Sequence, residues 1–139
     1  MNRTRLVTGL MVGVGGLLTL AATTQPSPIA QTQRGLWEIS GAPGAKAPLR
    51  QCVANVAALA EFEHRGKACS PKVISTTATS IVVEYRCGAA GFGRSQVDVI
   101  TPRSLRIDTQ GISNQLPFSY VLQARRVGDC PAQPAAIGH

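Results

Sequence analysis

The sequence has 139 residues, of which 44% are hydrophobic and 15% charged, so it holds enough apolar material for one folded domain and too little chain for two. The formal net charge is +7, and eleven of the fourteen basic residues are arginines, which favour planar, bidentate contacts with anions. Aromatic residues make up only 4% of the chain, which argues against the stacking surfaces that bind single-stranded nucleic acid.

Residues 1–21 are expected to form a secretory signal peptide. Two arginines precede an apolar, charge-free run over residues 6–20, and Thr19 and Ala21 are small residues at the cleavage positions. A transmembrane anchor is the alternative, but the run is shorter than the about 20 residues that a membrane-spanning helix needs. We therefore expect cleavage after Ala21 and a periplasmic or secreted protein without a transmembrane anchor.

The rest of the chain divides into three parts. Residues 22–33 are rich in Thr, Gln, Pro and Ala with no charge, which predicts a flexible leader. Residues 34–130 contain the periodic segments and are expected to fold as a single β-rich domain. Residues 131–139 contain two prolines and no periodic pattern, so we expect a disordered tail.

A strand at residues 36–40 is expected to open the domain, followed by a short α-helix over residues 53–63. In the helical segment the apolar residues recur at the three- and four-residue spacing of one helix face. Gly66 then provides a C-terminal stop signal.

Five more strands are predicted after the helix, over residues 73–79, 80–87, 95–101, 104–109 and 118–125. The alternation is clearest where Leu105 and Ile107 are expected to face the core. Short links at 88–93, 101–104 and 110–114 contain Gly, Pro or Asn and suit turns between antiparallel neighbours. The expected fold is therefore mainly β with one short α-helix: an antiparallel meander of five or six strands, or a small barrel-like sheet, with the helix on one face or at one end.

The four cysteines, Cys52, Cys69, Cys87 and Cys130, predict two disulfides, because an exported chain reaches an oxidising compartment. A zinc site is the alternative, but the cysteines lack a close C-x2-4-C pair and a nearby histidine pair. Of the three possible pairings we expect Cys52 with Cys69, at the two ends of the helical segment, and Cys87 with Cys130. We expect no metal and no cofactor.

Several short motifs follow one another along residues 34–130. They are Gly35-Leu36-Trp37-Glu38-Ile39, a cysteine that opens a helix at Cys52-Val53, a second cysteine at Cys69, a strand that ends at Cys87, and Arg126-Val127-Gly128-Asp129-Cys130. In this order they resemble the domain of unknown function 3617 family of exported bacterial proteins. The resemblance implies an envelope location and a cysteine-stapled β-rich domain, and it implies no activity or catalytic residue. The middle strands depart from the family pattern by holding more arginine.

Few residues are candidates for catalysis, and we expect no enzymatic activity. His64 would be the general base of a hydrolase, but the sequence suggests no nucleophile with an orienting group, so its ring is expected to complement the helix dipole. Glu61 and Glu63 point to different faces of a helix and make a poor acid–base pair. Trp37 is expected to fill the core rather than to anchor a ligand. The segment 91–93, with its two glycines, is interpreted as a turn.

Six arginines lie on or beside predicted strands, and the outer face of a meander would bring several of them together as an electropositive surface. They are Arg86, Arg94, Arg103, Arg106, Arg125 and Arg126. The expected partners are an anionic lipid, an anionic glycan or an acidic envelope protein. The alternative is a dispersed, solvated set of charges.

Taken together, these features predict an exported envelope protein that binds an anionic component or a protein partner without catalysing a reaction. A structural envelope protein without a ligand is the first alternative. A hydrolase that uses His64 is the second.

Overall fold

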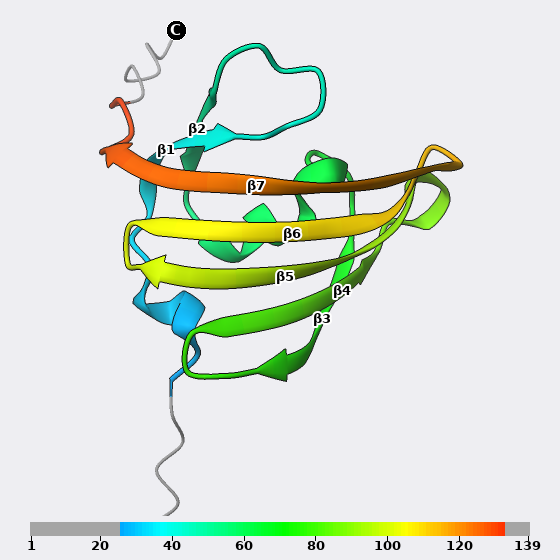
Figure 1. The fold of residues 1–139 in the computed structure, drawn as a ribbon, viewed down its shortest axis with the longest axis horizontal. Coiled ribbons are helices and arrows are strands. Elements are labelled where there is room, and N and C mark those ends of the chain that lie inside the picture. Colours follow the sequence, from blue (N-terminus) through cyan, green and yellow to red (C-terminus); the bar gives the residue numbers. More distant parts are fainter. Residues whose placement is uncertain (1–25, 133–139) are drawn as a thin grey trace, which may run out of the picture.

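A computed structural model describes residues 26–132, which form one antiparallel sheet of seven strands curved around a helix (Figure 1). The strand order is β2-β1-β7-β6-β5-β4-β3, so β3 to β7 form a meander that β1 and β2 extend past β7. The strands are β1 (Gly35–Ser40), β2 (Leu49–Val53), β3 (Ser70–Thr76), β4 (Ser80–Arg86), β5 (Gly91–Thr101), β6 (Ser104–Ser113) and β7 (Leu116–Gly128). The predicted mainly β, antiparallel fold class is confirmed.

The sheet has more strands than the five or six expected, because β2 was not predicted. Its residues are exposed except for Val53, so the segment shows no alternation of buried and exposed positions. The neighbouring strands are also longer than expected: β5 already begins at Gly91, and β6 continues to Ser113. The segment 91–93 is therefore part of a strand and not a turn. The hairpin after β6 turns at Asn114 and Gln115, which both have positive φ, as two-residue hairpin turns require.

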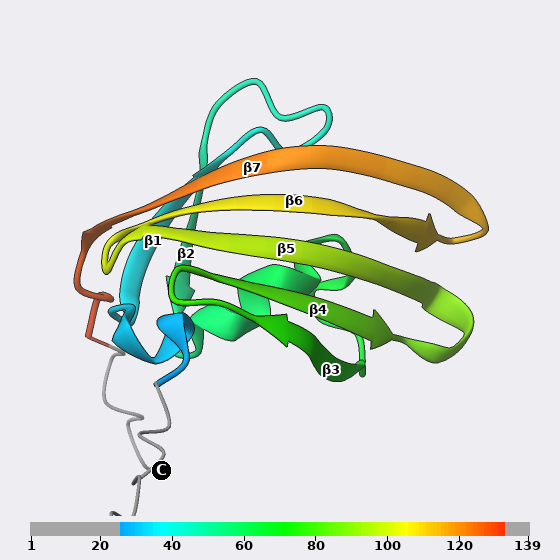
Figure 2. The same ribbon diagram turned by 60° about the horizontal axis from the view of Figure 1, so that its bottom comes forward.

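Three 3-10 helices accompany the sheet: η1 (Pro28–Gln31), η2 (Val56–His64) and η3 (Gly88–Ala90). The main helix, η2, begins later than predicted because Val53 belongs to β2, and Asn55 caps it by accepting a hydrogen bond from the Ala57 N–H at 3.1 Å. The segment is a 3-10 helix and not the α-helix that was predicted. It is kinked at Glu61, whose backbone leaves the helical region with φ −103° and ψ 23°. The helix lies on the concave side of the sheet (Figure 2), and its residues Val56, Leu59, Ala60 and Phe62 belong to the hydrophobic core.

The inner face of the sheet changes in character along the strands. Val99 opposite Leu105 and Val97 opposite Ile107 lie near one end, followed by Ser95 opposite Thr109 and then by Gly93 opposite Gly111. The apolar end of the sheet holds Trp37, Ile39, Leu105 and Leu122, all buried, beside the β5–β6 turn. The polar end holds Tyr85, Ser95, Thr109 and His64, also buried, toward the β4–β5 and β6–β7 connections. The two ends lie at the left and the right of Figure 1.

All four cysteines form disulfides, as predicted, but the expected connectivity is wrong. The bonds join Cys52 to Cys130 and Cys69 to Cys87. Pairing of Cys52 with Cys69 would require the two ends of η2 to lie close together. Instead, η2 crosses the concave side from β2 at one edge of the sheet to β3 at the other edge. Leu36 of β1 pairs with both Cys52 and Gly128, which brings the end of the chain beside β2.

Residues 26–33 are the described part of the expected flexible leader, but they pack against the folded domain. Pro28 is buried in η1, and the Gln33 N–H donates to the Pro102 carbonyl at 2.9 Å. The Gln33 carbonyl in turn accepts from Trp37 Nε1 at 3.0 Å, which satisfies the indole of a fully buried side chain. Trp37 is thus a core residue, as expected. The predicted signal peptide and the tail from residue 133 lie outside the described residues.

Candidate functional site

Three of the six candidate arginines form exposed ion pairs on the outer face of the sheet, where each arginine faces a carboxylate on its own or a neighbouring strand. The pairs are Arg94 with Glu84 (3.0 Å), Arg106 with Asp98 (3.6 Å) and Asp108 (3.3 Å), and Arg125 with Glu38 (3.2 Å). Exposed pairs of this kind contribute little stability, but they cancel most of the positive charge along the middle of the sheet.

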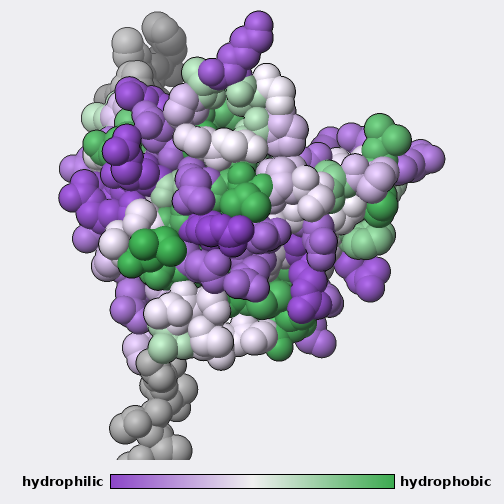
Figure 3. Space-filling model, viewed as in Figure 1, coloured by the Kyte–Doolittle hydropathy of each residue, from purple (hydrophilic) through white to green (hydrophobic). Residues whose placement is uncertain are grey.

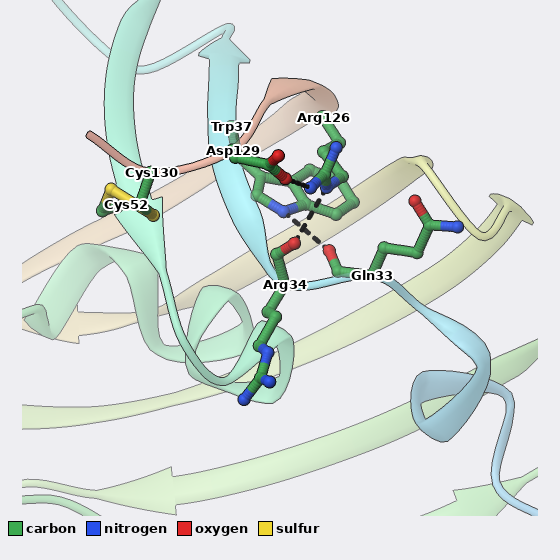
Figure 4. The surroundings of a disulfide bond; sticks show 7 residues. All are labelled: Gln33, Arg34, Trp37, Cys52, Arg126, Asp129 and Cys130. Atoms are coloured by element: carbon green, nitrogen blue, oxygen red, sulfur yellow. Dashed lines mark hydrogen bonds and ion pairs between the residues drawn. A yellow bond between two sulfur atoms is a disulfide. The ribbon is translucent and has the colours of Figure 1, made fainter. Parts of the chain in front are cut away.

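Arg126 lies on the other side of the sheet. It is opposite Trp37 in the β1–β7 ladder, and its side chain is only 14% exposed. Its Nε donates to the Arg34 carbonyl at 2.8 Å, and its Nη2 forms an ion pair with Asp129 (Figure 4). Arg126 therefore holds the end of the chain against β1 and does not belong to an outer positive surface.

Arg86 and Arg103 are the two candidates with no acidic partner in the part of the chain that the structure describes. Arg103 lies in the β5–β6 turn at the apolar end, and Arg86 is the last residue of β4 at the polar end. The structure therefore does not bring the six arginines together. Arg86 and Arg94 share a local environment, and the others are spread over the sheet.

Arg86 lines an open cavity of about 500 Å³ on the outer surface of the polar end, here called the outer hollow. The sides of the outer hollow are two rows of outward-pointing side chains, and each row runs across β4, β5 and β6 through residues that are paired in the sheet. One row is Arg86, Phe92 and Ile112, and the other is Glu84, Arg94 and Gln110. Figure 3 shows this outer face, with a band of hydrophilic residues across the middle, hydrophobic clusters beside it, and further hydrophobic residues on the lobe at the right.

Two glycines lie at the floor of the outer hollow. Gly93 and Gly111 face each other between the two rows, and a Cβ on Gly93 would lie 2.4 Å from Tyr85 Oη. A Cβ on Gly111 would lie 2.2 Å from the Phe92 carbonyl and 2.9 Å from Phe118 Cε1. The absence of side chains lets the two aromatic rings press against the strands from inside.

The outer hollow combines one unpaired guanidinium with an apolar side. Phe92 is 49% exposed and stands directly opposite Arg86 in the ladder, with Ile112 beyond it. A cavity of this size is within the usual range for small-molecule sites. Arginine donates planar, bidentate hydrogen bonds to carboxylate and phosphate groups, and an exposed aromatic ring binds an apolar group. The arrangement suits a molecule with an anionic group next to an apolar one.

His64 is the last residue of η2, at the helix end as expected, but it is only 3% exposed and lies inside the polar end. Its Nε2–H donates to the Ala90 carbonyl at 3.1 Å, and its ring meets Tyr85 and Phe118 edge-on. The Asn114 N–H donates to the same carbonyl, also at 3.1 Å. His64 thus helps to join η2 to the two connections beside the outer hollow.

The polar groups around His64 form hydrogen bonds with one another and with the backbone. The Glu63 carboxylate accepts a hydrogen bond from Tyr120 Oη at 2.8 Å, and Ser95 Oγ donates to the Ala60 carbonyl. Burial raises the pKa of Tyr120, and the hydrogen bond to Glu63 raises it further. Burial is also the main cause of the raised pKa of Tyr85. Both phenols are protonated at neutral pH and supply no base.

Residues 26–132 lack both a cluster of metal-binding side chains and a membrane-spanning helix. No group of three or more His, Cys, Asp or Glu residues there is placed to hold a metal ion. The same residues contain no helix that has both the length and the apolar character needed to cross a membrane.

No family model, curated protein or solved structure matches the chain. The outer hollow was missed by the sequence analysis, although a signal for it exists. Phe92 was assigned to a turn; if β5 is extended back to Gly91, the alternation places Phe92 and Arg94 on one face with Gly93 between them.

Proposed function

We propose that the protein is a non-enzymatic binding module whose ligand is an amphipathic anion, held in the outer hollow. The observation that carries the proposal is the position of Arg86, which has no acidic partner among the described residues and lies in the same cavity as the exposed Phe92. Arg86 binds the anionic group, and Phe92 and Ile112 bind the apolar part. Arg94, already paired with Glu84, lies beside the bound head group.

Anionic lipid fits this chemistry better than the other expected partners. A glycan would not use the apolar side of the hollow, and an acidic protein would meet an outer face whose other arginines are largely paired. A charge-assisted hydrogen bond from Arg86 is worth roughly 1.5–3 kcal/mol, which corresponds to about a tenfold or larger difference in affinity.

Two short-chain lipids test the proposal directly. Dihexanoyl-phosphatidylglycerol and dihexanoyl-phosphatidylcholine have the same acyl chains, and only the first has a net negative head group. Titration calorimetry below the micellar concentration should show tighter binding of the anionic lipid, and Arg86→Gln should remove that preference. Phe92→Ala should weaken binding of both lipids, because it removes the apolar contact.

Arg103→Gln is the matched control, since Arg103 is also exposed and without an acidic partner but lies at the other end of the sheet. It should leave both affinities unchanged. Equal binding of the two lipids, or equal effects of the two arginine variants, contradicts the proposed site. If neither lipid binds, a structural protein without a ligand is the better account.

The proposal includes export to the bacterial envelope, which rests on the signal sequence of residues 1–21 and agrees with two disulfides. Sequencing of the N-terminus of protein from the producing cell should begin within a few residues of Ala22. Recovery of the chain with Met1 in a membrane fraction contradicts it. Membership of the domain of unknown function 3617 family is likewise a proposal, supported by the order of the motifs in residues 34–130.

A further inference from the structure

The two disulfides differ in their exposure to solvent. Cys87 is 6% exposed and Cys69 is half-buried, so the bond between them is shielded. Cys52 and Cys130, whose bond is drawn in Figure 4, are both exposed. A cavity of about 390 Å³ is lined by both residues. An attacking thiolate needs access to a sulfur atom, so the second disulfide is the more open to attack.

The disulfides also differ in what happens to their two halves if the bond is cut. Cys69 and Cys87 directly continue the β3–β4 ladder, one step past the pair Ser70 and Arg86. The Cys87 N–H also donates to the Gly91 carbonyl at 2.8 Å. The ladder therefore keeps the two thiols side by side after reduction, and a high effective concentration favours closing the bond again.

Cys130 is held much less firmly. It lies two residues past Gly128, the last residue of β7, and no strand pairing in the described chain extends beyond that point. The residue between them, Asp129, is itself exposed and is attached through its ion pair with Arg126. A reduced Cys130 can therefore move away from Cys52, whereas Cys52 remains in β2 opposite Leu36.

From these differences we propose that the Cys52–Cys130 disulfide is a thiol–disulfide exchange site for a dithiol reductant. One thiolate of the reductant attacks either sulfur and forms a mixed disulfide, and the other cysteine leaves as a thiolate and takes up a proton. The second thiol of the reductant then displaces the remaining cysteine. Two electrons and two protons pass to this protein, and the reductant becomes a disulfide.

Reduction at this site frees Cys130 and preserves the sheet. The strand pairs of β1 with β2 and β7 do not involve the sulfur atoms, and Trp37 and the rest of the apolar end stay buried. The cavity beside Arg34 becomes wider, because Cys130 and Pro131 form part of its wall.

Limited reduction of the native, oxidised protein tests the order of attack. The protein is treated with a low concentration of dithiothreitol at pH 8, alkylated at intervals, then fully reduced and labelled with a second reagent for peptide mapping. The first label should appear on Cys52 and Cys130 at least ten times faster than on Cys69 and Cys87, while the far-ultraviolet circular dichroism stays unchanged. Labelling of both pairs at one rate, or of Cys69 and Cys87 first, overturns the proposal.

A trapping experiment tests the exchange with a protein reductant. A thioredoxin whose resolving cysteine is changed to alanine cannot complete the reaction, so the mixed disulfide accumulates. Mass spectrometry should find it attached to Cys52 or Cys130. Attachment to Cys69 or Cys87, or no adduct under conditions that trap a known protein disulfide, overturns the proposal. Both experiments are independent of ligand binding in the outer hollow.

Discussion

The two ends of the sheet close in different ways. At the apolar end Trp37 is completely buried, its indole donates one hydrogen bond to the Gln33 carbonyl, and Ile29 of η1 packs against the hydrophobic core to which Trp37 belongs. At the polar end the interior holds hydroxyl, phenol and imidazole groups, and two of these, His64 Nδ1 and Tyr85 Oη, have no hydrogen-bond partner among the described residues. The first arrangement maximises buried apolar surface, whereas the second leaves polar groups short of partners.

Under the proposed function, this difference separates stability from ligand binding within one small domain. Dense apolar packing at one end stabilises the sheet, and the proposed ligand site, the outer hollow, lies at the other end. Proteins commonly place sites in regions where packing is less favourable, because the remaining structure supplies the stability. The comparison predicts that substitutions at the apolar end cost more stability than similar ones at the polar end.

The largest effect is expected from Trp37→Ala. Removing a fully buried large aromatic side chain costs roughly 3–5 kcal/mol, because it combines lost burial with a cavity. Phe118→Ala at the polar end should cost less than half as much, since that ring is only half-buried. Urea unfolding followed by far-ultraviolet circular dichroism measures both variants. Equal losses would mean that the two ends do not differ in stability.

A smaller loss is expected from Gly93→Ala. The new methyl group would lie 2.4 Å from Tyr85 Oη, so the ring must shift, at a cost of about 1–3 kcal/mol. Gly128→Ala is the control, because nothing lies within 4 Å of its added Cβ, and it should change stability by less than about 0.5 kcal/mol.

Adding Tyr85→Phe to Gly93→Ala should restore part of the lost stability, because it removes the phenol oxygen nearest the new methyl group. Thermal unfolding of the single and double variants measures the coupling. No recovery in the double variant would show that the phenol oxygen is not the source of the strain and that the ring carbons, with Cζ 2.5 Å from the same methyl group, maintain it.

The two tyrosines at the polar end should respond differently to loss of the hydroxyl. Tyr120→Phe removes the hydrogen bond to Glu63 and should cost about 1 kcal/mol. Tyr85→Phe removes a buried hydroxyl without a partner and should be neutral or slightly stabilising. Paired urea titrations under identical conditions give the difference. A larger loss for Tyr85→Phe would show that Tyr85 Oη has a bonding partner in solution.

The smallest change in stability is expected from Glu61→Gln, and it should depend on pH. Burial raises the pKa of this carboxyl above its usual 4.5, and the charge of His64 opposes the shift. The folded state therefore holds the proton more tightly than the unfolded chain, so this contribution to stability is present below pH 4.5 and is lost as pH rises through the folded-state pKa. Glu61→Gln should be more stable than the parent protein at pH 7, and the difference should vanish at pH 3. A lower stability at pH 7 contradicts this sign.

Several features of the fold could be predicted from local sequence alone. The alternation around Leu105 and Ile107 identified a strand with one buried face, because side chains on a strand point to opposite sides in turn. The lone Trp37 within an apolar segment indicated a core residue, and the even number of cysteines indicated disulfides. These inferences depend on residue type and short-range spacing, which the sequence displays directly.

Other features were decided by contacts between segments that are distant in the sequence. The partner of Cys52 depends on β1 pairing with β7, which brings Cys130 to the edge strand from 78 residues away. The environment of Arg86 depends on the register of β4, β5 and β6, which places Phe92 opposite it and gives other arginines acidic neighbours. Strand register and edge position are properties of the whole sheet. A shift of one residue in the pairing of a strand would turn each of its side chains to the opposite face of the sheet. The sequence therefore determined which residues the protein has for a site, and only the tertiary structure decided which of them meet.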